Sequence, residues 1–127
     1  IERQHIAEAK FIRAYIYFYL LAVYGDQALL GNDNGDGVVL NLVPYNGYNP
    51  DKISGRASNA EIWGLIIKDL EEAIPDLPAN APDIKSRIRA NKTAAQALLS
   101  RVYLYKGTYT NNKQELEKSY ENYLLMN

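Results

Sequence analysis

Residues Ala14 to Tyr24 read Ala-Tyr-Ile-Tyr-Phe-Tyr-Leu-Leu-Ala-Val-Tyr and carry no charged side chain. They continue a helical pattern, so we predict one helix from about Glu2 to Tyr24, ended by Gly25 in a left-handed turn. A helix that is apolar on every side is enclosed by its neighbours, whereas spanning a bilayer takes roughly 20 apolar residues. This stretch is too short to span, so we expect it to be buried in protein and wrapped by the rest of the chain.

The composition is that of an ordinary globular protein. The 127 residues are 47% hydrophobic and 23% charged, with a net charge of -1, which predicts a single domain over residues 1–127. No cluster of Lys and Arg is present, which argues against nucleic acid as a partner. The absence of Cys excludes disulfides and thiolate zinc sites. The chain starts inside a helical pattern without a signal peptide, so we expect a piece of a longer protein.

Three further helices are predicted after the first. Ser58 and Glu61 form a capping box that opens the second helix, which Pro75 ends, and Trp63 shares its apolar face. Thr93 to Gln96 form a second capping box, opening a helix that ends at Gly107. A fourth helix follows over residues 113–125. On the second helix Asp69 lies among apolar rows, and we expect it to pair with Arg13 or Arg101.

A short internal echo relates the first and third predicted helices. Residues 13–17 read RAYIY and residues 101–105 read RVYLY. This pattern is typical of stacked helical hairpins. We therefore predict an all-α fold of tetratricopeptide-like helical hairpins, about four helices in total, with a long loop between the first two.

That loop, residues 26–57, has no helical period and is rich in Asn, Gly, Asp and Pro. Residues 38–40 and 42–43 are apolar and favour a short strand or hairpin arm. Loops this long are uncommon in compact domains and are often functional. The loop is therefore the first place to look for a site.

The best candidates for ligand binding are Tyr45, Asn46, Tyr48 and Asn49. A sugar ring packs its C–H face on an aromatic ring, while its hydroxyl groups hydrogen-bond to amide side chains. The other interpretation is structural: a turn whose tyrosine rings fold back onto the helices. The chain's eleven tyrosines do not choose between these interpretations, because Tyr suits crowded helix interfaces and sugar-binding surfaces alike.

Other chemistry finds less support in the sequence. Residues 32–37 read NDNGDG and begin like a calcium loop, but Val43 stands where the bidentate carboxylate belongs, so ordinary turn chemistry is favoured. His5 is the single histidine, so no metal cluster and no Ser-His-Asp arrangement can be assembled. Asp33 and Asp36 are interpreted as solvated turn residues and not as a glycosidase pair. We expect no cofactor and no metal.

Three segments together resemble the SusD/RagB family. Residues 9–15 (AKFIRAY) with 24–26 (YGD) resemble its "EARFLRAYYYFxLxxxYGD" helix, although Gln27-Ala28-Leu29 stands where the family usually has Val-Pro-Leu. Residues 56–78 resemble its R-x-S-x-x-E pattern ending in Leu-Pro, and residues 90–107 resemble its "R-x-T-K-x-A-A-x-A-L-L-A-R-V-Y-L-Y-x-G". The segments stand in the family's order and cover most of the chain.

The resemblance implies a function. Members of the family are lipoproteins on the outer face of the Gram-negative outer membrane. They bind glycans, in some members peptides, and act with a TonB-dependent transporter. This chain would be an internal part of the helical scaffold, without the lipid anchor. The implied function is non-catalytic capture of an oligosaccharide, such as starch or another polysaccharide, for uptake at the cell surface.

Two other classes of function stay open at this point. A tetratricopeptide-like protein-interaction scaffold would bind a partner chain and no sugar. A part of a glycoside hydrolase would release reducing ends from its substrate.

Overall fold

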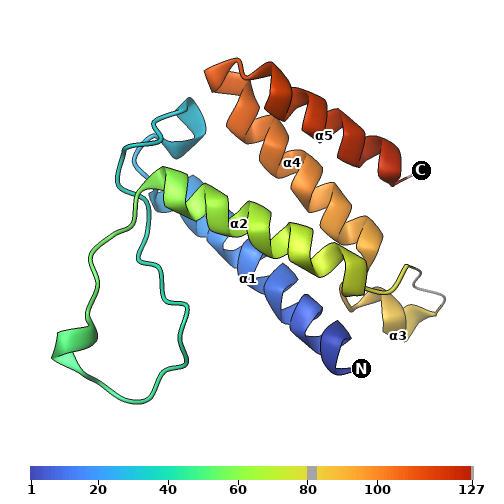
Figure 1. The fold of residues 1–127 in the computed structure, drawn as a ribbon, viewed down its shortest axis with the longest axis horizontal. Helices are drawn as coiled ribbons and strands as arrows, with labels where there is room; N and C mark the ends of the chain where they lie inside the picture. The colour runs from blue at the N-terminus through green and yellow to red at the C-terminus, as the bar shows by residue number, and fades with distance from the viewer. Residues whose placement is uncertain (80–82, 127) are drawn as a thin grey trace.

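The computed structural model describes residues 1–79 and 83–126, which form helices joined by loops (Figure 1). The five α-helices in the described part are α1 (Glu2–Tyr24), α2 (Asn59–Ala73), α3 (Ile84–Arg87), α4 (Lys92–Thr110) and α5 (Lys113–Leu125). Single 3-10 turns lie at Ala28–Leu30, Pro50–Lys52 and Ile74–Asp76. No strand occurs among these residues, so the all-α prediction is confirmed. Of the short strand or hairpin arm expected at residues 38–40 and 42–43, the strand is absent, and Val38 O accepts the Ala57 N–H of the returning chain at 2.9 Å.

The helices form two hairpins. α1 packs along α2, and α4 packs along α5, while α2 also contacts α4 and joins the two pairs. α1 and α4 run in the same direction, and α2 and α5 return (Figure 1). This is the arrangement that the echo between residues 13–17 and 101–105 predicts, because each echo segment lies on the first helix of a hairpin.

The core lies between α1, α2 and α4. These helices bury residues that recur three or four positions apart, as the helical period requires. The largest apolar side chains with almost no exposure are Trp63, Leu21, Ile62, Ile66, Leu70 and Val102. Trp63 packs near Phe18 of α1, with 6.1 Å between ring centroids, so its predicted place in the core is confirmed.

α1 is not enclosed on all sides, and this prediction was wrong. Ala14, Tyr17, Phe18 and Leu21 are buried against α2 and the loop that follows α1. On the opposite side, Ile12, Tyr15, Ile16, Tyr19 and Val23 are between 43% and 68% exposed. Apolar residues occur on every side of this helix, but among the described residues α1 has neighbours on one side only.

The ion pair expected at Asp69 is confirmed with Arg13. Arg13 Nε donates to Asp69 Oδ2 and Arg13 Nη2 donates to Asp69 Oδ1, both at 2.7 Å. The carboxylate is 1% exposed and the guanidinium 36%, so water reaches only the cation. Forked pairing of this kind fixes the alignment of α1 on α2.

Several predicted helix ends are confirmed and others are corrected. Ser58 Oγ accepts the Glu61 N–H at 3.2 Å, as the first capping box requires. The second box was wrong: Asn91 Oδ1 accepts the Ala94 N–H at 2.8 Å, so α4 begins at Lys92, and it continues past Gly107 to Thr110. Gly25 ends α1 in an extended conformation, φ -69°, and the left-handed residue is Gln27, φ 52°.

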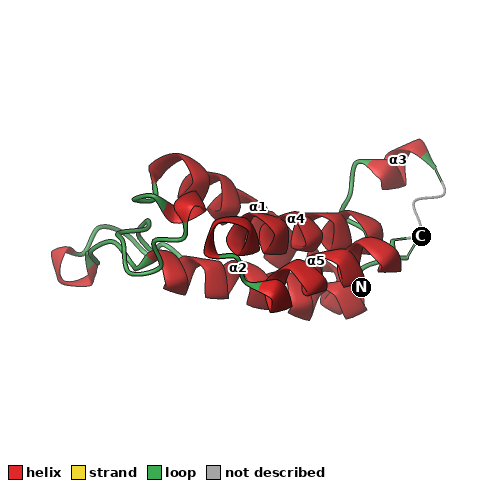
Figure 2. Cartoon of the chain, turned by 90° about the horizontal axis from the view of Figure 1, so that it is seen from above, coloured by secondary structure: helices red, strands yellow, loops and turns green. Residues whose placement is uncertain are grey.

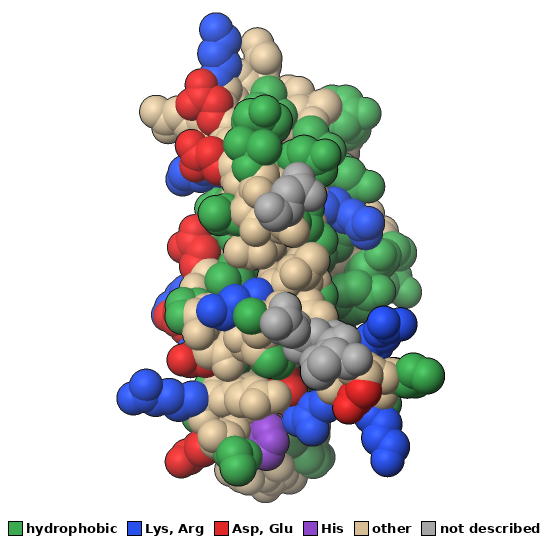
Figure 3. Space-filling model, turned by 90° about the vertical axis from the view of Figure 1, so that its right-hand side faces the viewer, with side chains coloured by type: hydrophobic (Ala, Val, Ile, Leu, Met, Phe, Trp, Pro, Cys, Tyr) green, Lys and Arg blue, Asp and Glu red, His purple; other side chains and the backbone are tan. Residues whose placement is uncertain are grey.

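The fold has two distinct ends and two distinct sides. Seen from above, the long loop leaves the helices at one end and α3 lies at the other (Figure 2). Viewed along the molecule, hydrophobic side chains gather along one side, and acidic side chains line the opposite side (Figure 3). The candidate site lies at the end from which the long loop leaves the helices.

Candidate functional site

The candidate site is the part of the long loop that projects from the helices, residues 41–56. It leaves the end of the bundle where α1 stops and α2 begins (Figure 1). Every residue from 41 to 51 is exposed, as are residues 53–56. Because the projecting segment contributes nothing to the core, its shape depends on how its two ends are held.

One end is held chiefly by Arg56. Its Nε donates to Gly37 O at 2.8 Å, and its Nη2 donates to Tyr24 O at 3.0 Å and to Asp36 O at 2.9 Å. Tyr24 is the last residue of α1, so the cation also neutralises the negative end of that helix. The Arg56 guanidinium thus connects the returning segment of the loop to the end of α1 and to residues 36–37, where the loop leaves the helices.

The other contacts close the base of the loop. The Gly37 N–H donates to Ala57 O at 2.7 Å, and the Ala57 N–H donates to Val38 O at 2.9 Å. The buried Tyr17 extends its hydroxyl from α1 and accepts the Asn41 N–H at 3.0 Å. Residues 37–41 and 56–57 are therefore fixed to the helices, and the residues between them project into solvent as the displayed loop.

The turn at residues 32–37 serves the fold. The fully buried Asn59 donates from Nδ2 to Asp26 O at 2.9 Å and to Asn32 O at 2.7 Å. Gly35 O and Asp33 O accept the first N–H groups of α2, those of Asn59 and Ala60. The backbone oxygens of the turn thus cap a helix, which fits the ordinary turn chemistry favoured by the sequence.

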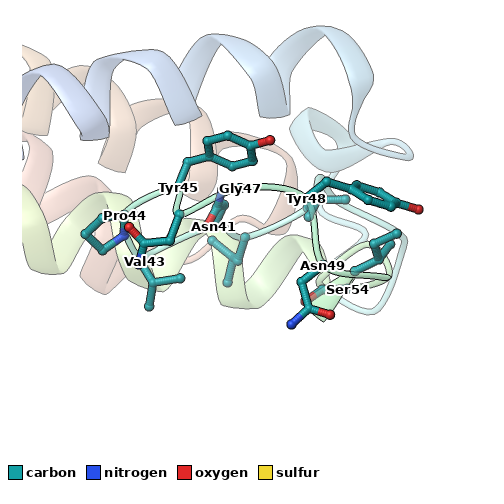
Figure 4. Close-up of a pocket in the computed structure, with 12 residues that line it drawn as sticks. Asn41, Val43, Pro44, Tyr45, Gly47, Tyr48, Asn49 and Ser54 are labelled. Carbon is teal, nitrogen blue, oxygen red and sulfur yellow. The ribbon is translucent and has the colours of Figure 1, made fainter. Parts of the chain in front are cut away.

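The four predicted binding residues lie together in the displayed loop. Tyr45, Asn46, Tyr48 and Asn49 line one hollow of about 590 Å³, with apolar neighbours that include Val43, Pro44 and Ile53. Tyr45 is 79% exposed and Tyr48 78%, so neither ring folds back onto the helices. Figure 4 shows both rings extending outward from the loop, and the Asn49 amide pointing to another side.

The loop's local geometry is set by its own turn residues. Asn49 Oδ1 accepts the Asp51 N–H at 3.0 Å and caps the 3-10 turn that begins at Pro50. Its amide N–H groups are left to point outward as hydrogen-bond donors. Gly47 adopts φ 101°, a conformation that residues with a side chain disfavour, and the chain bends there between the two tyrosines.

The described residues contain no candidate metal site. No three His, Asp or Glu side chains in that part of the chain lie close enough to hold a metal ion. His5 is exposed on the first turns of α1. In the same part of the chain, no helix combines the length and the apolar character needed to cross a bilayer.

Three residues that position the loop were not singled out as functional from the sequence: Tyr17, Arg56 and Asn59. Their partners are mostly backbone atoms of residues distant in sequence, and backbone atoms leave no trace in a residue pattern. Only Arg56 gave a signal, because it opens the second segment that resembles the SusD/RagB pattern.

The fold and the site together define a class: a tetratricopeptide-like helical scaffold that displays one anchored, aromatic loop. The chain belongs to the SusD-like family, because residues 2–104 match the SusD-like family model described as "Starch-binding associating with outer membrane". A SusD-like protein of Bacteroides ovatus is 30% identical over 106 residues, which make up 84% of this chain and 16% of that relative.

Solved structures of the family share the fold. A SusD superfamily protein from Bacteroides fragilis superposes with a TM-score of 0.81 at 26% identity, covering 98% of this chain and 27% of that one. One from Bacteroides thetaiotaomicron gives 0.76 at 26% identity, covering 94% and 23%. A putative sugar-binding protein from Bacteroides vulgatus gives 0.68 at 29% identity, covering 91% and 24%. The chain thus spans about a quarter of these relatives.

Proposed function

We propose that the protein captures a glycan at the outer-membrane surface, without catalysis, and that the displayed loop contributes to the binding site. The observation that carries the proposal is the pair of exposed rings, Tyr45 and Tyr48, held away from the core on a loop clamped at both ends. Rings that are exposed on a fixed loop bind with a small loss of conformational entropy. Family membership supports the choice of a glycan as the ligand.

The proposed contacts follow from the chemistry of sugars. A pyranose face packs on the Tyr45 or Tyr48 ring, because both surfaces are apolar. The amides of Asn46 and Asn49 then exchange hydrogen bonds with hydroxyl groups at the ring's edge. A hollow with an apolar wall and a few polar groups suits one or two sugar units of a longer chain.

The test uses the protein as its complete gene encodes it, with soluble starch and short glucose oligosaccharides as ligands in titration calorimetry. Tyr45→Ala and Tyr48→Ala are each expected to weaken binding roughly tenfold, a loss of about 1.4 kcal/mol. Tyr120→Ala, which removes an exposed ring on α5, is the matched control and leaves affinity unchanged. Unchanged affinity in both loop variants removes the loop from the site.

The same samples separate binding from catalysis. Under the proposal, incubation with starch releases no reducing ends, whereas a glycoside hydrolase would release them steadily. A protein-interaction scaffold would instead show no affinity for any glycan tested, in the wild type or in the variants.

The partner in the proposed uptake is a TonB-dependent outer-membrane transporter. Support comes from the family's description as associating with the outer membrane. Affinity purification of the complete protein from detergent-solubilised outer membranes tests it, with recovery of such a transporter in stoichiometric amount as the expected result. Recovery of the protein alone contradicts this part of the proposal.

A further inference from the structure

The short helix α3 displays two isoleucines to solvent. Ile84 is 80% exposed and Ile88 86%, and apart from the terminal Ile1 no large hydrophobic side chain in the described residues is more exposed. Ile88 caps α3 with a helical backbone, φ -83° and ψ -5°, so two residues four positions apart lie on one side of the turn. We define the α3 tip as residues 84–88.

Cations flank these isoleucines. Residues 85–92 read KSRIRANK, so four of the eight residues are Lys or Arg. Lys85 and Arg87 are exposed, and neither forms an ion pair with a residue that the structure describes. The conclusion that the sequence holds no cluster of Lys and Arg was therefore wrong for this segment, because the chain's net charge of -1 hides a local excess.

Two carboxylates lie at this segment, and both are engaged. Asp83 Oδ1 accepts the Ser86 N–H and the Ser86 hydroxyl, each at 2.6 Å, and caps α3. Arg89 Nε and Nη2 donate to the two carboxylate oxygens of Glu8 at 3.0 and 2.6 Å, which ties the segment to α1. Residues 83–92 hold one Asp against four cations, a local charge of +3, and Glu8 lowers it to +2.

The opposite end of the molecule carries the opposite charge. Residues 26–56, which include the displayed loop, hold four Asp against Lys52 and Arg56, a net charge of -2. The loop and α3 lie at opposite ends of the helices (Figure 2). Figure 3 faces the end that carries α3 and shows Lys and Arg side chains over its lower half, with hydrophobic side chains projecting among them. A negatively charged surface would therefore attract the α3 end and repel the loop end.

We propose that the α3 tip docks on an anionic lipid surface. Ile84 and Ile88 enter the boundary between headgroups and acyl chains, while Lys85 and Arg87 contact headgroup phosphates. This boundary suits apolar side chains flanked by cations, because the apolar groups leave water and the charges stay at the headgroups. The family model's description as associating with the outer membrane supports a membrane as the partner. Docking through α3 holds the displayed loop away from the lipid and open to the medium.

Nucleic acid fits the α3 tip less well. Affinity for nucleic acid comes mainly from cations that neutralise phosphates, and the tip offers two cations without a partner among the described residues. The two isoleucines would gain nothing from a phosphate backbone. A lipid surface uses both features of the tip, its charge and its apolar side chains.

Fluorescence tests the proposal on the protein as its complete gene encodes it, with other thiols replaced. Ile88→Cys carries a nitrobenzoxadiazole fluorophore at the tip, and Gln114→Cys, exposed at the start of α5, carries it as the matched control. Vesicles of phosphatidylglycerol mixed with phosphatidylcholine should shift the emission at residue 88 to the blue and protect it from acrylamide quenching. The emission at residue 114 should stay unchanged. Ile84→Cys replaces Ile88→Cys should the latter fail to fold, as judged by circular dichroism.

Charge variants test the cations in the Ile88→Cys background. Lys85→Gln/Arg87→Gln should raise the lipid concentration needed for half of the blue shift by roughly tenfold or more. Lys68→Gln/Lys113→Gln changes the net charge equally at exposed positions on α2 and α5, and it should leave that concentration within about twofold of the parent's. Equal effects of the two double variants contradict the docking of this tip.

Three other results would overturn the proposal. Blue-shifted emission at residue 88 before vesicles are added would mean that another part of the polypeptide covers the tip. Emission that stays unshifted while the vesicles bind the protein would place the contact elsewhere. Tighter binding to duplex DNA than to the anionic vesicles, lost in Lys85→Gln/Arg87→Gln, would assign the tip to nucleic acid.

Discussion

Asn59, Asp69 and Ser119 are the buried polar side chains of the described residues, and each joins two parts of the fold. Asn59 ties the turn after α1 to α2, and Asp69 holds Arg13. Ser119 and Ser100 each donate a hydroxyl hydrogen bond to the other's backbone oxygen, at 2.7 and 2.8 Å, between α5 and α4. Asn59 Nδ2, Asp69 and Ser119 all have partners on another part of the fold, whereas the buried Asn59 Oδ1 has none in the described part of the chain, so the partnered groups fix how these parts align.

The first prediction concerns the unequal burial of the Arg13–Asp69 pair. Arg13→Met leaves a buried carboxylate without its cation and should cost about 3 kcal/mol of unfolding free energy. The double variant Arg13→Met/Asp69→Leu removes the stranded charge as well, so it should be more stable than Arg13→Met alone. Urea denaturation measures both. Additive losses in the double variant would mean that the carboxylate does not depend on Arg13.

The second prediction concerns Tyr103, whose pKa is raised by burial and by its hydrogen bond to Glu71 Oε1 at 3.0 Å. Above about pH 10 an unfolded tyrosine ionises while folded Tyr103 keeps its proton. The folded state then binds more protons, so stability falls as pH rises.

At pH 7, Tyr103→Phe should have an unfolding free energy about 1 kcal/mol below that of the wild type, because the hydrogen bond is missing. Between pH 10 and pH 11, the unfolding free energy of the variant should fall less than that of the wild type. Urea denaturation across this range checks both effects. Tyr48→Phe, which removes an exposed hydroxyl, is the control and should follow the wild type. Parallel curves for all three proteins would contradict the prediction.

At the scale of the element, the start of α4 shows what local sequence did and did not reveal. Thr93-Ala-Ala-Gln96 matched the capping-box pattern, yet Asn91 two positions earlier holds the helix's free amide. Both residues are good caps, and the choice depends on where the preceding chain lets the helix begin. The bounds of α1 and of α5 were predicted correctly.

The third prediction follows from this cap. Asn91→Ala should cost about 1 kcal/mol of unfolding free energy, because the Ala94 N–H loses its partner. Thr93→Ala should change stability by less than about 0.5 kcal/mol, since Thr93 is exposed. Thermal and urea denaturation distinguish the two variants. The reverse order would restore Thr93 as the cap.

The fourth prediction concerns two glycines inside helices. A Cβ at Gly107 of α4 would lie 3.2 Å from Cβ of Glu115 and from side-chain atoms of Leu116, whereas one at Gly64 of α2 meets nothing within 4 Å. Gly64→Ala should therefore stabilise by about 0.5–1 kcal/mol, through helix propensity. Gly107→Ala should be less favourable by about 1 kcal/mol, because α5 must move away. Equal gains in urea denaturation would contradict the close approach of α4 and α5.

At the scale of the whole molecule, patterns within helices were more informative than patterns between them. The hairpins, the Trp63 core position and the Arg13–Asp69 pair were predicted, because helical period and charge among apolar rows report burial directly. The enclosure of α1 was predicted wrongly, because apolar residues show which sides favour contact but not which contact is present within a given stretch of chain. The loop's clamp at Arg56 was missed, since its partners are backbone oxygens.

The fifth prediction concerns the displayed loop. Replacing residues 42–54 by a short Gly-Ser linker should change the unfolding free energy by less than about 1 kcal/mol, because the loop buries no core surface and loop length costs little. Glycan binding by the complete protein should be lost under the proposed function. Arg56→Met is the contrasting change and should cost about 1 kcal/mol, because Gly37 O and Tyr24 O lose a donor while Asp36 O still accepts the Asp26 N–H. A large loss of stability on loop replacement would give the loop a structural role.

Arg56 and Tyr17 hold the two ends of the loop through backbone atoms and not through particular side chains. The scaffold therefore places almost no constraint on the sequence between residues 42 and 54. The sequence of that segment can be exchanged without changing the helices. Under the proposed function, substitutions there can change the ligand preference without destabilising the helices. A foreign peptide inserted in place of residues 42–54 should be held by the same two anchored ends.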